Sequence, residues 1–319
     1  MKKRRLGRSP IHITTIIMGT WQAGKAMWPG VNDSESRDAI RCAFEAGINT
    51  FDTAEAYGNG HSERVLGESL AHVREKVVIA TKVSQNHLEY GGVVAACDRS
   101  LKNLKTDYID IYQIHWPAGS WGSKTIPIGE TMEAMNDLKE KGKIRAIGVS
   151  NFSRTQLEEA SRFGRIDCLQ PPYSLFWRHA ERDLLPYCLE NDITILAYSP
   201  LAQGLLTGKF RVDQKFQPGD NRSKNKLFKG ENMQRAQEAI EKLRPVAERH
   251  GMTLAQLALS WVISHPRTCA IAGARNPQQV LDNAKAADVV LPESDLKEMD
   301  SISRIVTDRL DDSPVMWDS

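Results

Sequence analysis

Short apolar segments alternate along the chain with longer segments in which apolar residues recur every three or four positions. The short segments are rich in β-branched residues, which favour an extended backbone. Several are apolar almost throughout, a pattern typical of parallel strands that helices cover on both faces. The eight strands expected from this pattern span residues 13–20, 48–54, 77–83, 108–115, 144–151, 166–173, 193–200 and 268–274.

The longer segments between the expected strands carry helix signals. Residues 34–47 offer Ser34 or Ser36 as an N-cap, and Gly47 ends the apolar pattern. Residues 254–266 are more apolar and end at a proline, which cannot continue a helix. Each expected strand is thus followed by a helix or a connecting loop, as in a βα unit.

Eight such units in a chain of 319 residues predict a (β/α)8 TIM barrel. No Pro/Gly/Ser-rich linker divides the chain, so residues 1–319 are expected to form a single domain. A doubly wound sheet is the alternative, and it fits less well because no expected strand is followed by G-x-G-x-x-G. A turn at Ser9-Pro10 predicts a short N-terminal hairpin, and a long basic loop, residues 211–232, follows the seventh strand.

Composition narrows the classes of partner. The 42 basic and 40 acidic residues leave a net charge of +2, which favours neither a nucleic acid nor an anionic membrane as partner. The five cysteines stand singly and the eight histidines are scattered, so neither disulfides nor a metal site is expected. No segment approaches the roughly 20 apolar residues that span a bilayer. We therefore expect a cytoplasmic protein.

Titratable side chains occur at the ends of three successive expected strands. Asp52 stands near the end of the second, Lys82 of the third and His115 of the fourth, and Tyr57 follows Asp52 by five residues. Each alone has a structural explanation, such as a helix cap for Asp52 or a core histidine for His115. Because the C-terminal ends of barrel strands meet at one rim, their coincidence predicts a single site.

Together these four side chains suit proton transfer to a carbonyl oxygen. A phenol with a pKa near ~10 donates poorly at neutral pH, but a nearby ammonium lowers that pKa and a carboxylate holds the ammonium in place. Tyr57 is therefore the expected proton donor, assisted by Lys82, Asp52 and His115. Glu55, which lies between them in sequence, is expected to be a solvated loop residue without a catalytic role.

The chain resembles the aldo-keto reductase family over nearly its whole length, from about Leu6 to about Met299. The resemblance rests on the blocks FDTAEAYGNGHSERVLGESL, VVIATKV, YIDIYQIHWP, IRAIGVSNF, AYSPLAQGLLTGK and IAGARNPQQVLDNA, which occur in the family's order. It implies a (β/α)8 barrel that binds NADP(H) without a Rossmann motif. It also implies that Asp52, Tyr57, Lys82 and His115 are the catalytic residues, with Tyr57 as the general acid in reduction.

The resemblance further implies a set of cofactor contacts. Ser150, Asn151 and Gln170 match residues that hydrogen-bond the nicotinamide carboxamide, and Tyr198 matches the aromatic residue that stacks on its ring. The remaining implied contacts are Gly19, Thr20, Trp21, Asp52, Ser199, Pro200, Leu201, Gln203, Gly204, Lys209, Arg222, Gly273, Ala274, Arg275, Gln279 and Asn283.

The adenosine end departs from the family pattern. Many members have a Lys-Ser pair and a later Arg that holds the 2′-phosphate, whereas this chain has Gly273-Ala274, then Arg275 and Gln279. The clamping positions Lys209 and Arg222 offer substitutes, and Lys224, Lys226 and Lys229 are expected to add positive potential. NADP(H) is therefore the preferred cofactor, and NAD(H) is not excluded.

The expected substrate is a small carbonyl compound. Tyr57, His115, Trp21 and Trp116 are expected to contact it, and an apolar pocket with one polar end suits aldehydes and modest ketones. Further wall candidates lie in the loops after the strands and in the tail that follows Met299; they are Trp28, Trp121, Trp177 and Trp317.

We therefore expect an NADPH-dependent oxidoreductase that reduces aldehydes and some ketones to alcohols. One alternative is a cofactor-binding, redox-sensing regulatory subunit with slow turnover, like the channel β subunits of the same family. Another is a barrel enzyme that uses Lys82 as a Schiff-base nucleophile. The sequence carries no signal for oligomeric state.

Overall fold

Eight parallel strands close into a barrel in the computed structural model, which describes residues 1–318; Ser319, the last residue of the expected domain, lies outside the described residues. Neighbouring strands follow the order β10-β3-β4-β5-β6-β7-β8-β9, so the predicted barrel is confirmed and the doubly wound alternative is wrong. Each strand falls inside one of the eight expected segments. The strands are β3 (Ile16–Gly19), β4 (Thr50–Asp52), β5 (Val78–Val83), β6 (Ile109–Ile114), β7 (Ile144–Ser150), β8 (Cys168–Gln170), β9 (Thr194–Ala197) and β10 (Thr268–Gly273).

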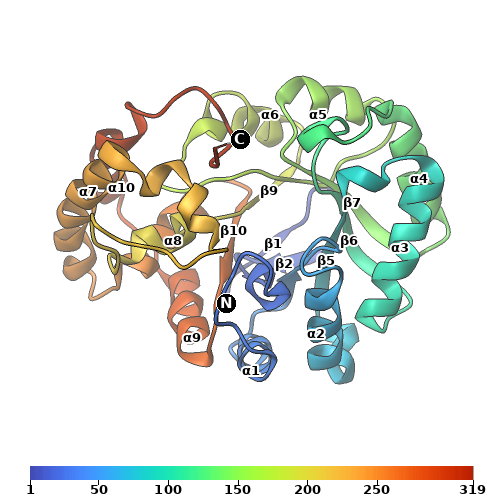
Figure 1. Cartoon of the computed structure of the whole chain (residues 1–319), viewed down its shortest axis with the longest axis horizontal. Helices are drawn as coiled ribbons and strands as arrows, with labels where there is room; N and C mark the ends of the chain where they lie inside the picture. The colour runs from blue at the N-terminus through green and yellow to red at the C-terminus, as the bar shows by residue number, and fades with distance from the viewer. Residues whose placement is uncertain (319) are drawn as a thin grey trace.

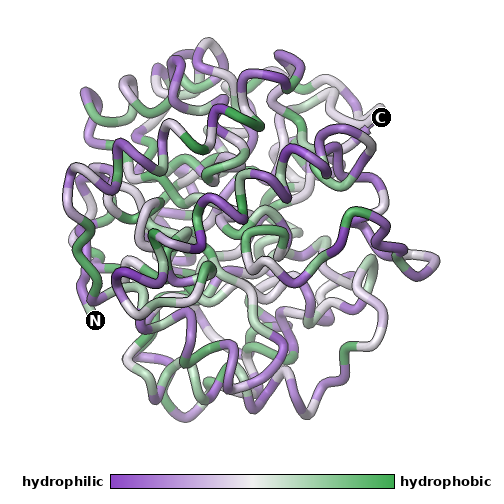
Figure 2. Tube along the Cα trace, turned by 90° about the vertical axis from the view of Figure 1, so that its left-hand side faces the viewer, coloured by the Kyte–Doolittle hydropathy of each residue, from purple (hydrophilic) through white to green (hydrophobic). Residues whose placement is uncertain are grey.

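Helices surround the strands on the outside of the molecule (Figure 1). Most are amphipathic and bury their apolar sides against the barrel, as the periodic pattern predicted, whereas α8 is buried from Ala255 to Ile263. Figure 2 shows the hydrophobic segments concentrated toward the middle of the molecule. The helices are α1 (Asp33–Glu45), α2 (His61–Leu70), α3 (Tyr90–Leu104), α4 (Ile128–Glu140), α5 (Arg154–Ser161), α6 (Leu184–Glu190), α7 (Gly230–Arg249), α8 (Leu254–Ser264), α9 (Pro277–Lys285) and α10 (Glu293–Thr307).

The first helix begins earlier than expected. Its N-cap is Asn32, whose side chain accepts a hydrogen bond from the Glu35 backbone N–H at 2.8 Å, so the expected cap at Ser34 or Ser36 is wrong. Asparagine caps as well as serine, and the Ser34 hydroxyl instead donates to the Asn32 side chain.

The predicted N-terminal hairpin is present as β1 (Lys3–Arg5) and β2 (His12–Thr14), which pair antiparallel. Its residue Ile13 is buried within the apolar cluster that fills the barrel interior. The backbone N–H of Gly7 donates to the Thr194 hydroxyl at the start of β9, at 2.8 Å. The hairpin therefore covers the N-terminal ends of the strands and leaves the C-terminal ends as the open face of the barrel. Within residues 1–318, no helix is long and apolar enough to cross a membrane.

Candidate active site

A cavity of about 1390 Å³ lies at the C-terminal ends of the strands. Its wall contains all the predicted site residues except three. Lys82 is fully buried beneath the wall. Thr20 and Ala274 are buried beside it, and the Thr20 hydroxyl is bonded to the Asp52 carbonyl at 2.9 Å. The sequence therefore located the cavity, and the structure separates side chains that face it from those that support it.

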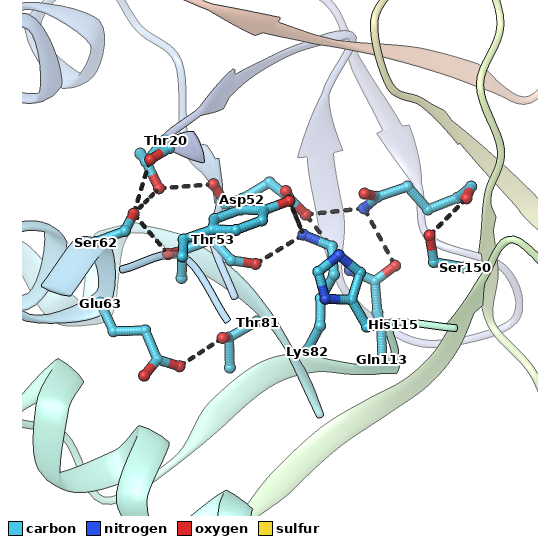
Figure 3. Close-up of polar contacts among 12 residues, drawn as sticks. Thr20, Asp52, Thr53, Ser62, Glu63, Thr81, Lys82, Gln113, His115 and Ser150 are labelled. Carbon is cyan, nitrogen blue, oxygen red and sulfur yellow. Dashed lines mark hydrogen bonds and ion pairs between the residues drawn. The ribbon is translucent and has the colours of Figure 1, made fainter. Parts of the chain in front are cut away.

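A hydroxyl cluster fixes the loop that carries Tyr57. The Ser62 hydroxyl, at the start of α2, donates to the Thr20 carbonyl at 2.8 Å and accepts from the Thr53 hydroxyl at 2.9 Å (Figure 3). These contacts join the ends of β3 and β4 to α2. Close backbone packing adds to them, because a Cβ atom at Gly58 would lie 2.2 Å from the Gly24 carbonyl oxygen. The loop between β4 and α2 therefore has little freedom to move Tyr57.

Lys82 links the predicted proton donor, Tyr57, to the carboxylate of Asp52. Its ammonium donates to Asp52 Oδ1 at 2.6 Å, to the Thr53 carbonyl at 2.7 Å and to the Tyr57 hydroxyl at 3.3 Å. Figure 3 shows Lys82 pointing toward Asp52 and Thr53. Because all three ammonium protons are engaged and the side chain is fully buried, the geometry speaks against Lys82 as a Schiff-base nucleophile.

The pKa of Tyr57 shifts upward, whereas the sequence predicted that the nearby ammonium would lower it. Burial raises the pKa of Tyr57, and Asp52 raises it further, while the Lys82 ammonium opposes both. Burial by itself would lower the pKa of Lys82, but the Asp52 carboxylate and the Tyr57 phenol raise it overall. Lys82 is therefore a permanent cation at neutral pH, and Tyr57 keeps its proton.

His115 faces Tyr57 edge to face, with ring centroids 5.6 Å apart. Burial, together with the nearby Lys82 charge, holds the pKa of His115 well below its usual range. The imidazole is therefore neutral at physiological pH and can act as a hydrogen-bond donor through one ring nitrogen. A neutral histidine orients a carbonyl oxygen without competing with Tyr57 as the acid.

The three residues predicted to hold the carboxamide form one hydrogen-bond chain. The Ser150 hydroxyl donates to the Gln170 carbonyl at 2.8 Å, and the Asn151 side chain donates to the Ser150 hydroxyl at 3.0 Å. The Gln170 amide in turn donates to Asp52 Oδ2 at 2.9 Å, and the Tyr198 hydroxyl donates to Asn151 at 2.9 Å. The predicted cofactor contacts are thus hydrogen-bonded, through Gln170 and Asp52, to the group that contains the predicted proton donor.

One residue of this network, Gln113, was missed from the sequence, and Glu55, which lies in a separate cluster, was misjudged. Gln113, fully buried on β6, donates to Asp52 Oδ2 at 3.4 Å. Glu55 is buried rather than solvated, because its carboxylate accepts from the Ser84 backbone N–H at 2.7 Å and pairs with Arg99 and His87. A glutamine within an otherwise apolar strand was the available signal for Gln113, whereas the partners of Glu55 lie too far along the chain to be read locally.

The loop after β9 has an unusual backbone. Ser199, Ala202, Gln203 and Gly204 all have positive φ values, between 48° and 95°. Non-glycine residues rarely adopt this conformation, and such strain clusters where backbone N–H groups are turned toward a ligand. Successive residues in this conformation can form an anion-binding nest, which suits the cofactor contacts that the resemblance implies for Ser199, Gln203 and Gly204.

Two arginines lie at the far end of the cavity. The Arg222 guanidinium lies 5.4 Å from the Trp28 ring and pairs with Asp220 at 2.5 Å. Arg275 lies 5.6 Å from the same indole, and burial together with Arg222 lowers the pKa of Arg275. The Gln279 side chain accepts from the Arg275 backbone N–H at 2.9 Å. Arg222 is therefore neutralised by its own loop, whereas Arg275 carries the freer charge.

The lysines of the long loop divide into two groups. Lys209 and Lys224 line the cavity as expected. Lys226 and Lys229 do not, because they form ion pairs with Asp311 and Asp318 in the C-terminal tail. The expectation that these two add positive potential to the cavity is wrong.

Aromatic side chains form much of the cavity wall. Trp21 stacks on Tyr57 with ring centroids 6.1 Å apart, and Trp116 contacts Trp121 edge to face at 5.3 Å. Trp28 and Trp317 also line the cavity, as expected. Trp177 does not: it is fully buried, and its indole N–H donates to the Pro314 carbonyl at 3.2 Å.

Several buried polar atoms of the wall lack partners within residues 1–318. They belong to residues from different loops around the cavity, and most are hydrogen-bond donors. Buried donors without acceptors are rare in folded proteins and indicate a site completed by a ligand. These atoms are Trp28 Nε1, His115 Nδ1, Gln203 Nε2, Arg275 Nη2 and Trp317 Nε1. Over the same residues, no group of His, Cys, Asp or Glu side chains is arranged to hold a metal ion.

A sequence profile described as "Aldo/keto reductase family" matches residues 15–304. The chain belongs to this family. As an aldo-keto reductase it is an oxidoreductase, and the fold expected from the resemblance is the one observed.

Named relatives of the family cover almost the full chain. The aldo-keto reductase YhdN of Bacillus subtilis is 36% identical, covering 95% of this chain and 93% of its own length. A protein named NADH-specific methylglyoxal reductase, from Escherichia coli, is 35% identical, covering 92% of this chain and 96% of its own length. A probable voltage-gated potassium channel subunit beta of Arabidopsis thaliana is 32% identical, covering 91% of this chain and 92% of its own length.

Solved structures give the same result. The glycerol dehydrogenase AKR11B4 of Gluconobacter oxydans superposes with a TM-score of 0.88 at 33% identity, covering 97% of both chains. An aldo-keto reductase of Klebsiella pneumoniae in complex with NADPH has a TM-score of 0.76 at 31% identity, covering 100% of both chains.

Proposed function

We propose that this chain reduces aldehydes and modest ketones to alcohols with NADPH, and that Tyr57 donates the proton. The observation that carries the proposal is the hydrogen bond between the Tyr57 hydroxyl and the buried Lys82 ammonium, which Asp52 holds at 2.6 Å. A group so placed gives up its proton to a neighbouring carbonyl oxygen while the ammonium stabilises the phenolate that remains.

The residues of the cavity fit a nicotinamide dinucleotide. The left-handed residues of the loop after β9, which are Ser199, Ala202, Gln203 and Gly204, offer backbone contacts for phosphates. Arg222, Arg275 and the donors of the wall that lack partners within residues 1–318 add contacts for phosphates and amides. When bound, the reduced cofactor supplies the hydride that adds to the carbonyl carbon. Tyr57 then completes the alcohol by protonating the oxygen, His115 orients that oxygen, and Trp21 and Trp116 form the apolar wall around the substrate.

The direct test is the oxidation of NADPH by the purified protein with a panel of aldehydes that includes methylglyoxal. We expect measurable turnover with several of them and less with ketones. A flat trace with every carbonyl compound, despite tight NADPH binding, would reject the enzyme and favour a redox-sensing subunit. The similarity to a probable channel β subunit makes this the alternative to exclude.

The pH dependence should follow the two perturbed side chains. Because the pKa of Tyr57 is raised, the phenol stays protonated through neutral pH, and reduction is lost only as the pH rises through that raised value. Because the pKa of His115 is lowered, the imidazole does not gain or lose a proton near the usual pKa of a histidine. In a profile of kcat/KM at fixed NADPH, we expect no histidine inflection near about pH 6.5 and no decline below about pH 10. A decline between these two values would contradict the assignment.

Cofactor choice should depend on Arg275. Within residues 1–318 no carboxylate pairs with it, in contrast to Arg222, so it is the candidate to hold the 2′-phosphate. Loss of a charge-assisted hydrogen bond costs about 1.5–3 kcal/mol. We therefore expect Arg275→Ala to lower kcat/KM for NADPH by about 10-fold or more, with little change for NADH. A wild-type kcat/KM for NADH equal to or above that for NADPH would show the proposed preference to be wrong.

A further inference from the structure

The end of the chain is paired with the loop that closes over the cavity. We call residues 209–229 the clamp loop and residues 311–318 the tail. Asn225 and Trp317 form an antiparallel bridge, in which the Lys226 backbone N–H donates to the Met316 carbonyl at 2.9 Å and the Asp318 N–H to the Lys224 carbonyl at 3.1 Å. The tail is thus paired with the clamp loop through this bridge, and the two move together unless these bonds break.

The tail is also tied to the barrel, but through different residues. The Arg182 side chain donates to Asp312 at 2.8 Å, and the indole of Trp177 donates to the Pro314 carbonyl. Figure 1 shows the segment after α10, in red, running from the α10 side of the molecule back toward its middle. The tail is therefore held to the barrel through Asp312 and Pro314. It is held to the clamp loop through Asp311, which pairs with Lys226, and through residues 316–318, which include Trp317.

The clamp loop is a bridge across the cavity. The backbone N–H of Asn221 donates to the Met27 carbonyl in the loop after β3, at 3.1 Å. On the other side, the buried Asn225 side chain donates to the Gln203 side chain at 3.1 Å, within the left-handed loop after β9. A dinucleotide that enters or leaves beneath this bridge must break such contacts.

Trp317 places its indole among the catalytic aromatic residues. Its ring lies edge to face with Trp21, at 6.2 Å between centroids, and parallel to the Tyr198 ring at 6.2 Å. Its buried Nε1 has no acceptor within the described part of the chain. The side chain thus forms part of the wall where the substrate is expected, although its backbone is paired with the clamp loop.

We propose that Trp317 is a specificity-determining residue whose position depends on closure of the clamp loop, so that aldehyde choice and cofactor retention are coupled. The inference rests on the proposed function. A substrate that packs against Trp317 stabilises the closed clamp, and by thermodynamic linkage a closed clamp strengthens binding of that substrate by the same factor.

Three variants test the coupling. Trp317→Ala removes the Trp317 indole from the cavity wall. Asn225→Ala loosens the clamp at a residue that does not line the cavity. Trp121→Ala is the matched control, because it removes another tryptophan of the cavity wall that belongs to the loop after β6. For each variant, NADPH release is measured in a stopped-flow chase, and kcat/KM is compared for a small and a bulky aldehyde.

We expect Trp317→Ala and Asn225→Ala each to speed NADPH release and to shift the ratio of bulky to small aldehyde by about 5-fold or more, in the same direction. Trp121→Ala should shift only the aldehyde ratio. Unchanged aldehyde preference in Asn225→Ala, or equal release from all three variants, would overturn the coupling. Absence of NADPH binding by the wild type would instead reject the proposed function, which separates the two failures.

Discussion

Replacement of Tyr57 by phenylalanine is expected to lower kcat for aldehyde reduction by about 10²–10⁴-fold, the contribution of a positioned general acid. The ring itself should remain in place, because its contacts with Trp21 and His115 do not involve the hydroxyl. Binding of NADPH should therefore be unchanged, and the loss should appear in kcat rather than in the dissociation constant. Steady-state kinetics and fluorescence titration of NADPH measure the two quantities separately.

Tyr198→Phe is the matched control for this substitution. Tyr198 is also a half-buried phenol in the cavity wall, but its hydroxyl donates to the Asn151 side chain at 2.9 Å. Loss of one neutral hydrogen bond changes a rate by about 10-fold at most. Undiminished turnover in Tyr57→Phe, or equal losses in the two variants, would remove Tyr57 from the role of acid.

The barrel was predictable because its signals are local and repeated. Each strand segment is apolar and β-branched, and a helix signal or polar loop separates it from the next. The rim that gathers Asp52, Lys82 and His115 then follows from topology, since parallel strands in a closed barrel all end on one face. Neither step requires knowledge of a contact between distant residues.

The errors have a different origin. Glu55 and Lys226 were assigned to solvent or to the cavity because their partners, Arg99 and Asp311, are far away in the sequence. The direction of the Tyr57 pKa was also misjudged, since burial outweighs the Lys82 charge and cannot be read from residue types alone. Ion pairs and desolvation depend on the packed structure, and a sequence pattern constrains them weakly.

Substitution of Lys82 by methionine is expected to cost about 3–5 kcal/mol of folding free energy, the usual cost of breaking a buried ion pair by removal of one partner. The Lys82 side chain is 0% exposed and that of Asp52 is 4% exposed, so neither charge is screened by water. The variant leaves the Asp52 carboxylate with only the amides of Gln170 and Gln113 as donors. Urea-induced unfolding at neutral pH, followed by circular dichroism, measures the loss.

The double variant Asp52→Asn/Lys82→Met separates charge from packing. With both charges removed, no buried ion is left unpaired, so most of the lost stability should return, whereas aldehyde reduction should stay abolished because nothing stabilises the Tyr57 phenolate. A single variant as stable as the wild type would show that the pair contributes little to folding. Recovery of stability without recovery of turnover would establish that Lys82 is retained for the chemistry of Tyr57, since an uncharged pair of similar volume suffices for the fold.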